Sequence, residues 1–431
     1  MIEKTRSILA EDFSSSPYIP QVVFYQTGLG TSGDFSLDLK SGVTGYGMID
    51  KIKESYAFIV YNWLPGDEIL MIGALIDDVG ILDSTEMDSF YDIFQAYVAL
   101  GNNDSHKQLE ANQFLSLYRT GGSKATRPMP KGTLKCIGVW DTVGALGIPL
   151  FTNRSSDPHC LGFVDTQLGK HVQYAFHALA IHETREDFLP TKWQQPPEQR
   201  QAGQILKQVW FPGSHSDVGG GYAEHDLADL ALIWMVANLI EYGLLAIDTE
   251  FIFAIPAPKF GWGQMEPHNP REDFPASLSY STIRKLPKRS KEVILTQERF
   301  HSSIISRNDL DEDLKKTLER SPDLITNLLP LEIEMKARWT RECGKQRSQF
   351  CEIREEVLDL SSNHHHHHSN QRHSILEEVE DSGQLGSKEL DGKVINTTTT
   401  TVTSNSKFGF LRFAKLKLWR GQSLGSIFSF L

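Results

Sequence analysis

The stretch that most constrains the fold runs from Trp210 to Tyr222 and places a histidine, His215, in a polar loop that ends in three glycines. A short apolar run, Gln208 to Phe211, leads into this loop, and a long apolar segment of helical character, Leu227 to Leu245, follows it. A strand that passes through a glycine-rich loop into a helix is typical of α/β proteins, which present reactive side chains at the carboxyl edge of a parallel sheet. We therefore predict an α/β fold in which His215 lies at a functional edge.

A second candidate side chain, Asp141, ends another apolar run, Leu134 to Trp140. An aspartate at the end of a strand is often the N-cap of a helix or part of an Asx turn, which is one interpretation of Asp141. The other interpretation is catalytic, because α/β-hydrolases carry their nucleophile, acid and histidine in that order along the chain. In such a site the acid orients the histidine and stabilises its imidazolium form. Since His215 follows Asp141, we predict that the two form a catalytic pair.

Two further residues are secondary candidates for the same site. Asp217 lies two residues after His215, and its alternative role is to stabilise the turn or to bind the loop amides. His301 lies in a polar segment, Arg299 to Ser303, of exposed character, and is the second choice for the catalytic base. His215 has a plainer alternative too, that of a hydrogen-bonded histidine that holds its own turn.

The nucleophile that would complete such a site is absent from its expected place. An α/β-hydrolase carries it in a G-x-S-x-G segment, on a sharp turn between a strand and a helix. That turn belongs after the predicted strand Glu68 to Gly73, where Ala74 stands instead and a helix begins without an N-cap residue. The segment Gly421 to Gly425 does match the pattern, but it follows the histidine and no predicted strand precedes it. We interpret that match as chance.

The remaining pattern predicts alternating strands and helices. A β-rich run, Gln21 to Gln26, precedes a glycine-rich loop, and apolar residues at helical spacing predict a helical region over 90–117. We also predict a helix over 171–182, on which His177 and His182 would be packing or capping residues. Strands and helices in alternation favour a parallel sheet with helices on its faces.

Several separate motifs, in this order, resemble the α/β-hydrolase family of type VI secretion phospholipase effector catalytic domains. They are Val23 to Thr31, Pro65 to Ile69, Gly138 to Gly144, His177 to Arg185, Trp210 to Tyr222 and Arg299 to Ile304. The resemblance implies a serine esterase or lipase that acts on lipid-like substrates, with Asp141 as the acid and His215 as the base.

The resemblance also shows where this chain departs from the family pattern. The family carries a Gly-Phe-Ser-Arg-Gly elbow after its Pro-Gly-Asp-Glu segment, and this elbow is missing between Gly73 and Ala74. The opening strand of the family is also missing before residue 20, so the fold is expected to be truncated at both places. Loss of a triad serine costs about a million-fold in rate. We therefore expect the chain as written to be inactive, as a degenerate copy, a splice variant or a mis-predicted reading frame, or to be a pseudo-enzyme that binds a lipid or protein partner through the remnant pocket.

A weaker alternative is a dinucleotide-binding protein. Gly28, Gly30 and Gly33 match G-x-G-x-x-G after a predicted strand. A dinucleotide site needs a helix that begins within this loop and holds the pyrophosphate at its N-terminus. The residues that follow contain two more glycines and no early helix, which counts against this function.

Composition excludes other classes of function. The formal net charge is −12, which argues against nucleic-acid binding, because phosphate contacts need clustered lysine and arginine. The four cysteines have no C-x-x-C spacing, so we predict no metal site, no disulfide framework and no cofactor. The first residues lack the apolar core of a signal peptide, and no apolar stretch reaches the ~20 residues of a spanning helix. We expect a cytoplasmic protein.

The chain divides into four predicted parts. Residues 1–19 are a lead-in, 20–307 the α/β-hydrolase-like catalytic domain, 308–354 a helical extension, and 355–431 a low-complexity, disordered tail. Within the tail, residues 407–420 hold five basic side chains among aromatics and leucines, which predicts weak contact with an anionic membrane surface.

Overall fold

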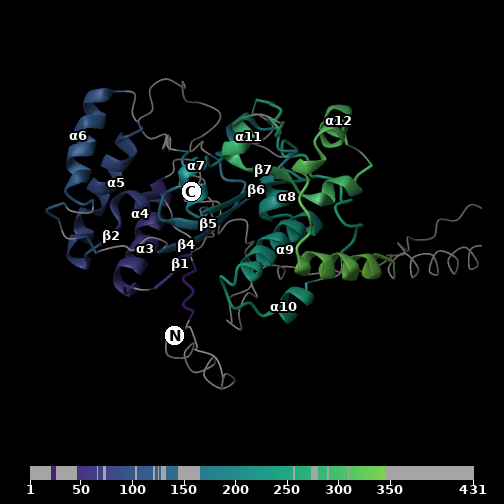
Figure 1. The fold of residues 1–431 in the computed structure, drawn as a ribbon, viewed down its shortest axis with the longest axis horizontal. Coiled ribbons are helices and arrows are strands. Elements are labelled where there is room, and N and C mark those ends of the chain that lie inside the picture. Colours follow the sequence, from purple (N-terminus) through teal and green to yellow (C-terminus); the bar gives the residue numbers. More distant parts are fainter. Residues whose placement is uncertain are drawn as a thin grey trace, which may run out of the picture.

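The computed structural model describes residues 21–25, 46–65, 67–70, 74–101, 104–119, 122–124, 126–127, 133–143, 166–255, 258–272, 280–288, 291–308 and 310–344. The centre of the described chain is a five-stranded sheet of order β1-β4-β5-β6-β7, in which every neighbouring pair is parallel. Its strands are β1 (Ile69–Leu70), β4 (Leu134–Trp140), β5 (Val172–Ala180), β6 (Ile205–Phe211) and β7 (Glu298–Phe300). The predicted α/β class, a parallel sheet flanked by helices, is confirmed (Figure 1).

The described helices fall into two groups on either side of the sheet (Figure 1). One group is α3 (Tyr46–Asn62), α4 (Ala74–Val79), α5 (Phe90–Ala99) and α6 (Ser105–Ser116). The other contains α8 (His215–Gly219), α9 (Asp226–Glu241), α10 (Thr249–Phe253), α12 (Glu312–Arg320) and a helix over 330–344. Smaller elements are the antiparallel pair β2 (Ile81–Leu82) and β3 (Thr126–Arg127), the helices α7 (Pro197–Gln201) and α11 (Lys291–Thr296), and the 3-10 turns η1 (Ser84–Ser89), η2 (Glu186–Phe188), η4 (Ser302–Ser306) and η5 (Pro322–Leu324).

Hydrophobic clusters cover both faces of the sheet, and a third one packs near β7 around Leu179, Trp210 and Phe300. Ile137 and Val139 of β4 pack into the core of α3 to α5, whereas Trp140 of the same strand packs into the core built on α9. Helix α9 is buried along most of its length, from Asp226 to Asn238. Because helices lie on both faces, the central strands are apolar on both faces, as is typical of parallel sheets.

This double burial explains an error in the sequence prediction. Segment 171–182, predicted to be a helix, forms β5, which is paired with β4 on one side and β6 on the other. A strand buried on both faces has no alternation of polar and apolar residues, so its pattern does not distinguish it from a buried helix.

One further secondary-structure prediction is wrong. Residues 21–25 are not in a strand, and Val22 and Val23 are largely exposed. The helical region predicted over 90–117 is confirmed and consists of two helices, α5 and α6. Asp104 caps the start of α6 by accepting a hydrogen bond from the backbone N–H of His106. A short aspartate side chain favours this N-cap position over the helix interior.

Several predicted features lie outside the described residues. They are the glycine loop of Gly28, Gly30 and Gly33, the match at Gly421 to Gly425, the tail 355–431 and its basic stretch 407–420. Within the described part of the chain, no helix combines the length and the apolar character needed to cross a bilayer.

Candidate functional site

The carboxyl ends of three parallel strands place the candidate residues together. Asp141 directly follows β4, and His215 is the first residue of α8, four residues after β6 ends at Phe211. Asp141 has φ 45°, in the left-handed region that residues other than glycine seldom adopt. Such backbone strain costs about 1–3 kcal/mol and is typical of functional sites.

Asp141 and His215 are hydrogen-bonded to one another. The Nδ1 atom of His215 lies 2.8 Å from Oδ2 of Asp141, and the aspartate is completely buried. The other oxygen, Oδ1, accepts a hydrogen bond of 2.8 Å from the backbone N–H of Ala180 at the end of β5. Because an ionised carboxylate only accepts hydrogen bonds, Nδ1 of His215 must carry the proton, and a neutral ring then has its lone pair on Nε2.

Arg284 is a third member of this site that the sequence did not indicate. Its Nη1 and Nη2 donate to Oδ1 and Oδ2 of Asp141 at 2.6 and 2.9 Å, and Nη1 also donates to the carbonyl of Ala180 at 2.7 Å. Burial by itself would raise the pKa of Asp141, but the charge of Arg284 and the hydrogen bond from His215 hold that pKa well below its usual range. Arg284 is 143 residues from Asp141, in a proline-rich segment without periodic pattern, so no sequence signal pointed to it.

Glu183 and Arg185 fix the backbone of His215. The buried carboxylate of Glu183 accepts a hydrogen bond of 3.2 Å from the backbone N–H of His215. The same carboxylate is held by Arg185, whose Nε and Nη2 donate at 2.9 and 2.8 Å. The guanidinium of Arg185 lies 3.5 Å above the ring centre of Phe188, and that ring meets the imidazole of His215 edge-on at 5.0 Å. Through these contacts, Glu183 and Arg185, which follow β5, hold the loop after β6 in place.

Asp217 takes part in a different set of hydrogen bonds. Its Oδ2 accepts from the backbone N–H and hydroxyl of Ser214 at 2.8 and 2.9 Å, which forms a capping box at the start of α8. Its Oδ1 lies 2.6 Å from Nδ1 of His268. Asp217 thus binds a loop amide, the alternative role expected from the sequence, and also pairs with a histidine that the sequence did not single out.

His301 is placed in a separate buried cluster. Its Nε2 lies 2.8 Å from Oε1 of Glu332, its Nδ1 lies 2.8 Å from the hydroxyl of Ser303, and its ring stacks on Phe211. The expectation that His301 is exposed is wrong, because Glu332 of the helix over 330–344 covers it. No local sequence pattern indicates this contact between residues 31 positions apart.

His177 and His182 support the backbone beside the site. His177 points from β5, accepts a hydrogen bond of 3.2 Å from the backbone N–H of Thr142 on Nε2, and contacts Gln208 through Nδ1. Burial lowers the pKa of His177 to about 4, so this ring is neutral. His182 accepts a hydrogen bond of 2.9 Å from the backbone N–H of Gly213, in the loop that leads to His215.

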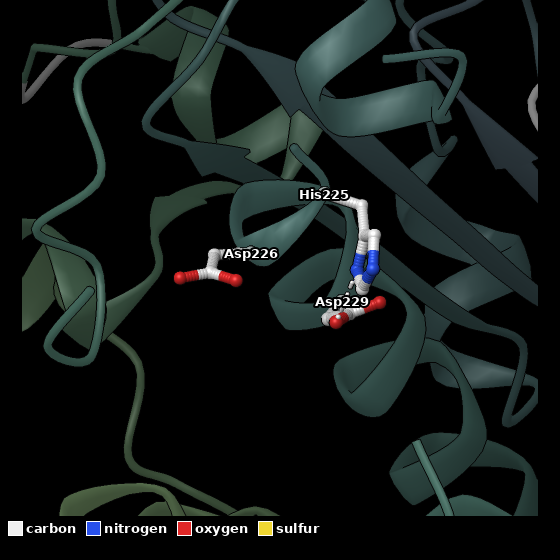
Figure 2. A group of neighbouring side chains, drawn as sticks. All are labelled: His225, Asp226 and Asp229. Atoms are coloured by element: carbon white, nitrogen blue, oxygen red, sulfur yellow. Dashed lines mark hydrogen bonds and ion pairs between the residues drawn. The ribbon is translucent and has the colours of Figure 1, made fainter. Parts of the chain in front are cut away.

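A group of possible metal ligands lies at the start of α9. It consists of His225, Asp226 and Asp229, and one ligand atom of each lies within 4.8 Å of the others. Figure 2 shows His225 and Asp229 turned toward one another and Asp226 to one side. His225 Nδ1 lies 2.8 Å from Asp229, and Asp226 accepts a hydrogen bond of 2.7 Å from the backbone N–H of Phe260. The positive end of the α9 dipole disfavours a cation there. We interpret the cluster as the attachment of the segment around Phe260 to α9.

The connection from β1 to α4 holds no nucleophile. Strand β1 ends at Leu70 and α4 begins at Ala74, so only Met71, Ile72 and Gly73 lie between them. None of these three residues has a hydroxyl or thiol group. By sequence, the three residues between β1 and α4 therefore supply no nucleophilic side chain.

Comparison with known proteins gives one family. The family model described as T6SS, phospholipase effector Tle1-like, catalytic domain, matches residues 3–238, more than half of the chain. An uncharacterized protein of Saccharomyces cerevisiae, YEL023C, is 48% identical over 44 residues, which are 9% of this chain and 6% of the yeast protein. A solved structure of the Tle1 effector bound to the VgrG spike from the type 6 secretion system aligns with 20% identity and a TM-score of 0.20, over 46% of this chain and 34% of that chain. The chain thus spans well under two thirds of both proteins.

Replacement of Arg284 by Met should destabilise the protein by about 3–5 kcal/mol, because it leaves a buried carboxylate without its cation. Urea unfolding measures this. Arg119→Met is the matched control, since Arg119 holds Asp78 by the same two-point contact at a partly exposed position and should cost about 1 kcal/mol or less. Equal losses in the two variants would contradict the proposed importance of the buried pair.

The neutral His177 should make stability depend on pH. Its folded pKa of about 4 lies below the unfolded value of about 6.5, so the unfolded chain binds a proton that the folded chain does not. Stability should fall as the pH drops from about 6.5 to about 4, by a total of about 3 kcal/mol. His177→Gln, which keeps one acceptor and one donor, should flatten this part of the profile, whereas His106→Gln at an exposed position should not. An unchanged profile in His177→Gln would contradict this assignment.

Proposed function

We propose that this chain, which belongs to the family of T6SS phospholipase effector Tle1-like catalytic domains, binds a lipid or another ester-bearing amphiphile without covalent turnover. The family supports a lipase-like ancestry and hence a lipid-like ligand. The single observation that carries the loss of turnover is the connection from β1 to α4, in which Met71, Ile72 and Gly73 offer no hydroxyl or thiol. A serine hydrolase needs such a group at this turn.

What remains of the site favours binding over chemistry. Asp141 holds the imidazole of His215 by Nδ1, and Arg284 neutralises the carboxylate. In a serine hydrolase the Nε2 atom of this ring accepts the hydroxyl proton of the nucleophile. Without a nucleophile, Nε2 is a hydrogen-bond acceptor that a bound ligand can use.

A second candidate function is serine hydrolysis by a longer form of the protein. The pairing of Asp141 and His215 at 2.8 Å, supported by Arg284 and Glu183, is the observation that favours it, since this is the acid and base arrangement of an active site. An in-frame segment inserted between Gly73 and Ala74 would supply the missing elbow. The chain as written would then be a splice variant or a mis-predicted reading frame.

Three finer points remain predictions from the sequence. They are the domain limits 20–307, 308–354 and 355–431, a cytoplasmic location, and a protein as the alternative occupant of the pocket. The dinucleotide alternative through Gly28, Gly30 and Gly33 would require a change in nicotinamide fluorescence when the cofactor is mixed with the protein.

Fluorophosphonate labelling tests the loss of turnover. The chain should not be labelled, because it has no activated serine, and it should hydrolyse p-nitrophenyl octanoate no faster than His215→Ala does. A fluorescent octanoyl ester should nevertheless bind, and His215→Ala should weaken that binding, whereas His106→Ala at an exposed position should not. Labelling of the unaltered chain that disappears in His215→Ala would overturn the proposal and favour the hydrolase.

A further inference from the structure

A second carboxylate–imidazole pair lies in the same loop as the first. His268 Nδ1 lies 2.6 Å from Oδ1 of Asp217, and the backbone N–H of His268 donates to Oδ2 at 3.0 Å. Asp217 is two residues after His215, and its side chain is completely buried. The pair of Asp217 and His268 is thus built in the same way as that of Asp141 and His215.

The protons in this second pair follow from its hydrogen bonds. Asp217 accepts from the backbone N–H of Ser214, from its hydroxyl and from the backbone N–H of His268, as only an ionised carboxylate with free lone pairs does well. Nδ1 of His268 must therefore carry a hydrogen, and the lone pair of the neutral ring lies on Nε2. In the neutral form of each ring, His215 and His268 therefore have their acceptor at Nε2.

Both of these Nε2 atoms are unused within the described part of the chain. Within the described residues, the contacts of His215 and His268 go through Nδ1, the backbone N–H or the ring face. Both side chains reach solvent, with 18% and 27% of their surfaces exposed. A polar atom that is fixed in direction and left without a partner at a partly exposed position is available to a ligand.

The two imidazoles are connected by short contacts. The ring of Tyr222 stacks on His268 with a centroid distance of 3.8 Å and an interplanar angle of 16°. The side chain of Tyr222 is also hydrogen-bonded to that of Ser214, the residue directly before His215. Tyr222 therefore holds His268 against the loop that carries His215, and Asp217 joins the same two segments through Ser214 and His268.

We propose that His268 is a second ligand-binding residue of the site, and that the site prefers amphiphiles whose polar head carries hydroxyl groups. This inference rests on the proposed function, namely that the sheet edge around His215 binds a lipid-like ester. One ligand hydroxyl donates to Nε2 of His215, in the place of the missing serine hydroxyl, and a second donates to Nε2 of His268. A head group without hydrogen-bond donors leaves both acceptors unsatisfied.

Carbethoxylation by diethyl pyrocarbonate, followed by peptide mass spectrometry, tests the proposal on the unaltered chain. The probe is 1-octanoylglycerol, with two free hydroxyls, and the matched control is its 2,3-di-O-methyl derivative, which has none. Saturating 1-octanoylglycerol should slow the modification of both His215 and His268, because a hydroxyl bound to Nε2 blocks the lone pair that attacks the reagent. The dimethyl derivative should protect neither, and the exposed His106 should react equally under all conditions.

The other outcomes separate the two proposals. Protection of His215 alone would overturn the role of His268 and leave the proposed function in place. Equal protection by the dimethyl derivative would overturn the preference for hydroxyl groups. Protection of neither histidine would contradict the proposed function itself. As an independent check, His268→Gln should weaken 1-octanoylglycerol binding about fivefold, the loss of one hydrogen bond, while His106→Gln should leave it unchanged.

Discussion

The carboxylate of Asp141 is the constraint on which the rest of this site depends. It is completely buried, and a buried charge is tolerated only when it is paired and hydrogen-bonded. Its donors come from three separate parts of the chain, namely the end of β5 through Ala180, the loop after β6 through His215, and the segment 280–288 through Arg284. This one carboxylate therefore sets the positions of the loops at the sheet edge, and the strained backbone of Asp141 is maintained by the same contacts.

The two ends of the candidate site differ in what they offer chemically. Asp141 and His215 are oriented by Arg284, Glu183 and the loop backbone, whereas the three residues between β1 and α4 include no hydroxyl or thiol. In this arrangement the imidazole of His215 keeps its orientation, but the hydroxyl that it would activate in a serine hydrolase is absent. His268 resembles His215 in this respect. Both histidines are held by buried carboxylates, and both leave Nε2 to a ligand.

The sequence predicted the parts of this account that depend on local pattern. Strands that end in Asp141 and in the loop of His215 indicated a shared sheet edge, and the structure places the two side chains in contact, while their catalytic role remains a prediction. Strand β5 was predicted to be a helix, because burial on both faces removed the alternation that identifies a strand. Arg284 and the burial of His301 by Glu332 could not be predicted, since both depend on contacts between distant segments that no local pattern encodes.

The most direct test of the central claim is the transcript sequence across the codons for Gly73 and Ala74. The account predicts that the two codons are joined directly, so that the protein in the cell lacks the nucleophile and acts by binding. An in-frame segment at this point that encodes Gly-x-Ser-x-Gly would contradict the account. The protein would then be a serine hydrolase that uses Asp141 and His215.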